Sequence, residues 1–170
     1  MDILAMEYII SEDKGDTTRH WEDIIGALRI NYNGVILTKL VDYPDEGYIG
    51  YWIYHDIEVW MRSLKQLISD GEASLGFTDD SYYFRFRLEN ENVIFLIDVG
   101  NAEQNRLYPG EGKGYPLLTR LFLKESIALG HRFIDDITSR YKNMDLVEIY
   151  EFKQALGEAD HYVNEYMKTH

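Results

Sequence analysis

A histidine and two carboxylates lie close together in the first half of the chain, at His55, Asp56 and Glu58. An imidazole beside carboxylates can act as a general base or bind a metal ion. Three aromatic residues nearby could form a pocket around them: Tyr51, Trp52 and Trp60. Such a site needs a further partner, and no second histidine follows at helical spacing. The set favours a helix start with a surface histidine, and a small hydrolase or ligand-binding enzyme is the alternative.

Glu158 and His161 have the spacing of one metal-binding element in the di-iron carboxylate helix bundles. Those proteins need a second element on a facing helix, and the residue three positions after Glu125 is Ala128. The chain also has no cysteine, which excludes thiolate zinc sites, iron–sulfur ligation, disulfides and cysteine nucleophiles. We therefore predict no metal site, no cofactor and no catalytic residue.

The glycine-rich segment from Tyr108 to Gly114 has the composition of a loop that binds phosphate through its backbone amides. Its spacing differs from that of a Walker loop. Leu107 occupies the position of the first glycine, and Gly114 occupies that of the serine or threonine after the lysine. Glu111 would also repel a phosphate group. We expect a flexible loop that faces a partner.

Four charged residues interrupt apolar patterns, and we treat them as a candidate buried polar cluster. Glu125 has apolar neighbours three and four positions away on a predicted helix, where an unpaired carboxylate would be costly. Arg85 and Arg87 share one face of a predicted strand, and Asp98 lies on the next strand. The four residues could line a binding groove. Alternatively, they form ion pairs that stabilise the margin between sheet and helix.

The chain has 170 residues and a formal net charge of −13, and its acidic residues concentrate in the turns. Such a field repels nucleic acid and anionic membranes and attracts basic partners. Tyrosines beside the acidic residues could anchor a partner. The candidate partner-binding residues are Asp42, Asp45, Glu46, Tyr48, Tyr51, Asp79, Asp80 and Tyr82. We expect a protein partner, with a basic toxin domain as one candidate, and neither a nucleic acid nor a membrane.

The cellular compartment is predicted from features that the sequence lacks. No stretch reaches the roughly 18 uncharged apolar residues that a membrane-spanning helix needs. The chain begins Met1-Asp2, with no basic region before an apolar run. The absence of cysteine fits a reducing compartment. We expect a cytoplasmic protein.

The elements that must position these residues begin with a hairpin over Arg29 to Thr38. Asn33-Gly34 favours a type I′ turn, which pairs Tyr32 with Val35. An extended aromatic run then leads into a helix that starts near Asp56 and ends before Gly71. A three-stranded meander follows. Its strands are expected at 73–78, 82–88 and 93–99.

Two long helices complete the predicted fold. The first runs from Pro116 to Tyr141, and the second runs from Leu146 to Met167 after a break. The last helix carries a narrow apolar seam, which packs on the preceding helix or on a second subunit. We predict one α+β domain spanning residues 1–170, an antiparallel sheet with the helices mainly on one face, and a monomer or weak homodimer.

This order of elements, with the segment Gly-Phe-Thr-Asp-Asp-Ser-Tyr from Gly76 to Tyr82, resembles small bacterial immunity-type proteins of polymorphic toxin systems. The resemblance covers roughly Leu28 to Tyr141 as an order of elements and transfers no site residue. It implies a binding protein that neutralises a cognate toxin by occluding its active site, and no enzymatic activity. Two further alternatives are a nucleic-acid mimic and a structural or regulatory subunit that assembles through the last helix.

Overall fold

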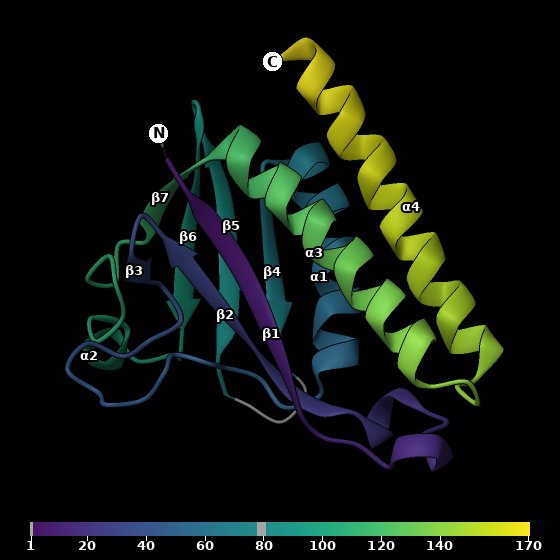
Figure 1. The fold of residues 1–170 in the computed structure, drawn as a ribbon. Coiled ribbons are helices and arrows are strands. Elements are labelled where there is room, and N and C mark those ends of the chain that lie inside the picture. The colour runs from purple at the N-terminus through teal and green to yellow at the C-terminus, as the bar shows by residue number, and fades with distance from the viewer. Residues whose placement is uncertain (1, 78–80) are drawn as a thin grey trace.

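The structure is a computed structural model that describes residues 2–77 and 81–170. Two antiparallel sheets and a set of helices form an α+β fold, as predicted (Figure 1). The strands of the first sheet, in the order β1-β2-β3, are β1 (Leu4–Glu12), β2 (Ile25–Tyr32) and β3 (Val35–Ile36). Asn33 and Gly34 have φ of 53° and 84°, and Tyr32 lies opposite Val35, which confirms the hairpin. Strand β1, which pairs with β2 over most of its length, was not predicted from the sequence.

The meander forms a second sheet. Its strands, in the order β4-β5-β6-β7, are β4 (Glu72–Gly76), β5 (Tyr83–Glu89), β6 (Asn92–Asp98) and β7 (Tyr115–Leu118). The first three lie close to their predicted positions. The prediction that Pro116 begins a helix is wrong, because Pro116 lies in β7 opposite Ile94. An edge strand tolerates a proline because one row of its amides has no sheet partner to bond.

The helices are α1 (Ile53–Asp70), α2 (Ala102–Asn105), α3 (Thr119–Arg140) and α4 (Leu146–Thr169), with short 3-10 turns η1 (Gly15–Thr17) and η2 (Trp21–Asp23). Two of the helices, α1 and α3, pack on these sheets. The predicted start of α1 at Asp56 is wrong, because the helix begins at Ile53 and Asp56 is a buried residue of its first turn. Its end is confirmed, since Gly71 follows in the left-handed conformation with φ of 81°.

Trp60 on α1 lies in the core between the helices and the second sheet. Its ring centroid is 5.8 Å from that of Phe84, 5.2 Å from Phe86 and 6.0 Å from Phe122. The indole N–H donates to Ser126 Oγ on α3 at 3.1 Å. The aromatic faces of β5, α1 and α3 are therefore held together around one side chain whose polar atom is satisfied.

The last helix, α4, packs against both α1 and α3 (Figure 1). Most of its apolar seam is buried within this chain: Phe152, Leu156, Ala159 and Val163 are buried, and Ile149 and Tyr166 are half-buried. Intrachain contacts therefore account for the seam without a second subunit. None of the helices in the described parts of the chain is long and apolar enough to cross a lipid bilayer.

Candidate functional site

A loop over residues 39–46 leaves the first sheet after β3 and is closed at its neck by one buried hydroxyl. Thr38 Oγ1 accepts a hydrogen bond from the Ile30 amide at 3.1 Å and donates to the Gly47 carbonyl at 2.5 Å. Gly47 has φ of 76°, and a Cβ atom there would lie 2.5 Å from the Ile36 side chain. Only glycine fits this position, so the neck fixes where the loop leaves the sheet.

The tip of this loop carries the first group of candidate residues. Asp42, Asp45 and Glu46 are all exposed, and none of them forms an ion pair with a described lysine or arginine. Asp45 Oδ1 accepts the Gly47 amide at 2.9 Å, which orders the turn. Between these acidic residues lies Tyr43, 55% exposed. Sequence reasoning missed Tyr43, although its place inside the acidic run was a signal for it.

The loop is tied down on two sides. The Val41 amide donates to the Leu107 carbonyl in the segment after α2, next to which the loop runs in Figure 1. On the other side, the Arg29 guanidinium lies 4.7 Å from the centroid of the Tyr48 ring and donates to the Glu46 carbonyl at 3.4 Å. Tyr48 is half-buried by this contact. Tyr48 therefore helps to hold the loop in place through its contact with Arg29.

The other two candidate tyrosines lie in adjoining segments. Tyr51 is 46% exposed, and its carbonyl accepts the Gly26 amide at 2.8 Å. The Tyr82 ring is half-buried against Phe77, with centroids 4.7 Å apart. A Cβ atom on Gly50 would lie 3.6 Å from the Phe77 ring, so the segment before Tyr51 lies against the aromatic pair. The remaining candidates, Asp79 and Asp80, lie outside the described residues.

The histidine and carboxylates at the start of α1 do not converge. The His55 ring packs on Trp21 with a centroid distance of 5.1 Å, and Trp21 meets Trp52 edge to face at 5.5 Å. Glu58 instead pairs with Arg62 one turn further along the helix, at 2.5 Å. Within residues 2–77 and 81–170, no group of three or more histidine, aspartate or glutamate side chains is placed to hold a metal ion.

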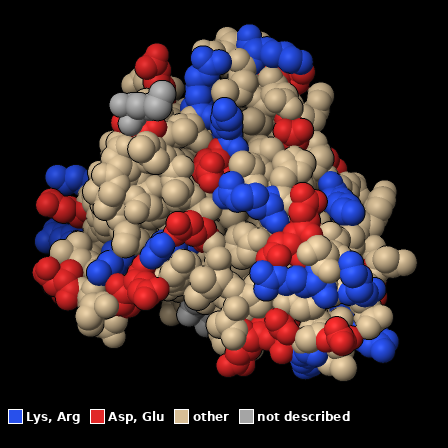
Figure 2. Space-filling model, viewed as in Figure 1, with Lys and Arg blue, Asp and Glu red and all other residues tan. Residues whose placement is uncertain are grey.

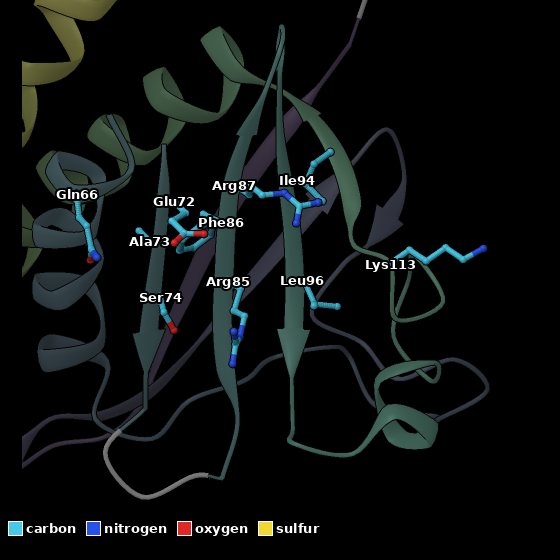
Figure 3. A pocket seen from close by; sticks show the side chains of 10 residues that line it. All are labelled: Gln66, Glu72, Ala73, Ser74, Arg85, Phe86, Arg87, Ile94, Leu96 and Lys113. Carbon is cyan, nitrogen blue, oxygen red and sulfur yellow. The ribbon is translucent and has the colours of Figure 1, made fainter. Parts of the chain in front are cut away.

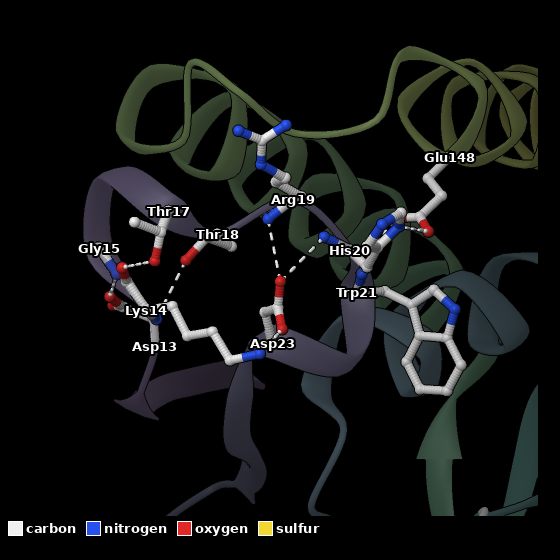
Figure 4. A network of polar contacts seen from close by, with 10 residues as sticks. All are labelled: Asp13, Lys14, Gly15, Thr17, Thr18, Arg19, His20, Trp21, Asp23 and Glu148. Carbon is white, nitrogen blue, oxygen red and sulfur yellow. Dashed lines mark hydrogen bonds and ion pairs between the residues drawn. The ribbon is translucent and has the colours of Figure 1, made fainter.

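A network of hydrogen bonds joins the loop between β1 and β2 to the start of α4 (Figure 4). Asp23 accepts the side chain of Lys14 and the backbone amides of Arg19 and His20, at 3.0 and 3.2 Å. The Lys14 contact, with these amides, lowers the pKa of Asp23 to about 2. Glu148 on α4 accepts the Trp21 amide at 2.9 Å and pairs with the His20 imidazole at 3.1 Å, which raises the pKa of His20.

The expected buried cluster of Glu125, Arg85, Arg87 and Asp98 is not formed. Glu125 on α3 pairs with Arg132 at 2.9 Å, beside the β1 strand. Arg85 and Arg87 are exposed, because their strand faces the core with its phenylalanines and directs the arginines away from it. Part of the expectation survives, since Arg85 Nε lies 2.7 Å from Asp98 Oδ2. The Gly100 amide, with Asn105 and Arg85, lowers the pKa of Asp98.

The arginines line a depression of about 250 Å³ on the outer face of the second sheet (Figure 3). Ile94 and Leu96 form part of its floor, and Lys113 of the loop before β7 also lines it, with a side chain that extends away from the sheet in Figure 3. Arg85 pairs with Asp98, and Arg87 pairs with Glu89 at 2.5 Å. Both guanidinium groups therefore have carboxylate partners, whereas Glu72 and Lys113, which also line the depression, form no ion pair with a described residue.

No protein-family model, curated protein sequence or solved structure matched this chain.

Proposed function

We propose that this protein is an acidic binding module that neutralises a bacterial toxin by covering a basic active site, as an immunity protein does. The observation that supports the proposal best is the loop tip, where Asp42, Asp45 and Glu46 flank the exposed Tyr43 in the sequence and form no ion pair with a described cation. The neck at Thr38 and the contacts of Arg29 and Leu107 order the loop before any partner arrives. An ordered loop loses less conformational entropy on binding than a disordered one.

The carboxylates of this loop are available to a partner, because none of them forms an ion pair with a described lysine or arginine. Many acidic residues elsewhere contact a cation within the chain, for example Asp23 with Lys14, Glu7 with Arg29 and Asp136 with Arg140. Figure 2 shows acidic and basic side chains interspersed over the face formed by β1, α3 and α4, rather than one acidic field. The free carboxylates of Asp42, Asp45 and Glu46 are therefore well placed to attract a basic partner.

The chemistry of the tip suits two separate roles. Unpaired surface charges speed diffusional encounter with an oppositely charged partner, and salt weakens this effect. An exposed aromatic ring can enter a pocket on the partner and slow dissociation. In this arrangement the carboxylates steer the partner and Tyr43 anchors it, with Tyr51 as a second exposed ring on the following segment.

The test is a surface-plasmon measurement against the toxin domain encoded by the neighbouring gene, at low and high salt. The triple variant Asp42→Asn, Asp45→Asn, Glu46→Gln should associate roughly tenfold more slowly at low salt and lose most of the salt dependence. Asn keeps the Oδ1 acceptor for the Gly47 amide. The control triple Asp70→Asn, Asp135→Asn, Glu151→Gln removes three exposed, unpaired acids on other elements and should associate much faster than the loop triple.

The Tyr43→Ala variant tests the anchor separately. Loss of a central aromatic contact should speed dissociation by roughly 30-fold, corresponding to about 2 kcal/mol, with little change in the association rate. If both loop variants bind with wild-type kinetics, the loop is not the binding surface. If the protein neither binds the neighbouring product nor protects cells that express it, the immunity function itself is wrong.

A further inference from the structure

A second site lies at the opposite end of the fold from the acidic loop, where α3 begins and α4 ends (Figure 1). A cavity of about 680 Å³ separates the two helix ends. This volume falls within the roughly 300–1,000 Å³ of small-molecule sites. Its apolar walls come from Leu118, Leu121, Tyr166 and Met167. The cavity shares no residue with the loop at 39–46, so the inference is independent of the proposed function.

The N-terminus of α3 opens onto this cavity without a side-chain cap. The N-cap residue is Leu118, which has no polar side-chain atom, and no side-chain hydrogen bond caps the helix. The Thr119 amide donates to the Glu91 carbonyl at 2.9 Å. The amides of Arg120 and Leu121 have no carbonyl within the helix to bond, because they belong to its first turn. Together with the helix dipole, these amides favour a negative charge at this end.

The buried hydroxyl group of Thr119 also points to a ligand in this cavity. It lines the cavity and is 3% exposed, and its Oγ1 has no hydrogen-bond partner among the residues that the structure describes. Burying a hydroxyl without a hydrogen-bond partner is energetically unfavourable. Rotation about χ1 exchanges the hydroxyl and the methyl group, and threonine in helices adopts both rotamers. The hydroxyl can therefore turn to donate to an anion at the first turn of α3.

Two cations border the cavity and, together with the amides at the start of α3, favour a negatively charged group there. Arg120 Nη2 donates to the Met167 carbonyl at 3.5 Å, which holds the guanidinium across the gap between the helices. Lys124 follows one turn later on the same face of α3 and forms no ion pair with a described acidic residue. Asp2 and Glu91 also line the cavity. These two carboxylates would repel a doubly charged phosphate more than a single carboxylate.

We propose that this cavity binds a monoanionic amphiphile, specifically a medium-chain carboxylic acid. The carboxylate lies at the first turn of α3, where it accepts from the Thr119 hydroxyl and the free amides and faces Arg120 and Lys124. The hydrocarbon chain lies against Leu118, Leu121 and Met167. The cavity is much larger than a carboxylate group, and its apolar walls account for the hydrocarbon part of the ligand.

The test is a titration of the full chain with octanoate, followed by the amide chemical shifts of the protein. The shifts of Arg120 and Leu121 should move in a saturable way. Acetate, octanol and inorganic phosphate are the comparison probes, and each should bind at least several-fold more weakly than octanoate. Octanol binding as tightly as octanoate would overturn the carboxylate position, and tighter binding of phosphate would overturn the ligand class.

Two variants assign the contacts. Thr119→Val keeps the shape of the side chain and removes the hydroxyl, and Lys124→Gln removes one cation; each should weaken octanoate binding several-fold. Lys142→Gln, an exposed lysine outside the cavity, is the matched control and should bind as the wild type does. Thr119→Val should not destabilise the protein, because the hydroxyl it removes has no partner. Unchanged affinity in both variants, or no shift of the two amides at millimolar octanoate, would overturn the site.

Discussion

Asp23 is the residue whose charge is most strongly tied to the folded state. It accepts three donors from the segment between β1 and β2, and these contacts lower the pKa of its carboxyl group to about 2. A carboxyl group whose pKa is lower in the folded than in the unfolded chain stabilises the fold above the unfolded pKa of about 4. As the pH falls from about 4 to about 2, this contribution is lost.

The variant Asp23→Asn should therefore lower the free energy of unfolding by about 1 kcal/mol at pH 7, after allowance for solvent screening. The difference from the wild type should shrink through this pH range and vanish near pH 2. Urea unfolding at pH 7, 4 and 2.5 measures it. Asp135→Asn, an exposed aspartate with no ion pair among the described residues, is the control and should change the free energy by less than about 0.5 kcal/mol. An equal loss at all three pH values would contradict this role.

At the same scale, sequence reasoning found the acidic residues of the loop and missed how their neighbours behave. Charges in a turn are exposed almost wherever the turn lies, so Asp42, Asp45 and Glu46 could be identified from the sequence. Whether a tyrosine is an anchor or a support depends on contacts across the fold. Tyr48 meets Arg29 from another strand, and that contact leaves no local signal. Glu125 likewise pairs two turns away with Arg132 rather than with the arginines of β5.

At the scale of elements, one glycine in a turn with positive φ and one glycine within a helix test the backbone conformation. Gly34 has φ of 84°, and no atom lies within 4 Å of the place where its Cβ would be. Gly34→Val should therefore destabilise the protein by about 1 kcal/mol or more through backbone strain alone.

Gly157 lies within α4, also in open space and without positive φ, so Gly157→Ala should stabilise the protein by roughly 0.5–1 kcal/mol. Equilibrium unfolding in urea measures both, and equal signs for the two changes would contradict the assigned geometry.

The elements that could be predicted were those with a strong local signal. Asn33-Gly34 specifies its own turn, and the break before Leu146 separates two helices. The elements that were missed depend on distant partners. β1 is defined by its pairing with β2, and β7 by its pairing with β6, where a proline is acceptable only because β7 is an edge strand. Trp52 is the N-cap of α1 without a side-chain cap, so Asp56 was the better local candidate for the helix start.

At the scale of the whole molecule, the acidic residues that give the net charge of −13 differ in whether they form an ion pair within the chain. Ion pairs within the chain neutralise some acidic residues locally, and the three carboxylates of the loop at 39–46 form no ion pair with a described lysine or arginine. Most of the apolar seam of α4 is covered by α1 and α3, whereas Tyr43 and Tyr51 are exposed, as are Leu146, Val147 and Tyr150 at the start of α4. The carboxylates of the loop, with Tyr43 and Tyr51, are the physical basis of the proposed function.

Hydrogen–deuterium exchange of the protein, alone and with the toxin domain encoded beside its gene, tests the central claim most directly. Because the loop is proposed to lie in the interface, amides in residues 38–51 should exchange more slowly in the complex, with the largest change between Val41 and Glu46. The outer face of the second sheet, including Arg85 and Arg87, should exchange at the same rate in both states. Protection confined to that sheet face, with none in residues 38–51, would contradict the account.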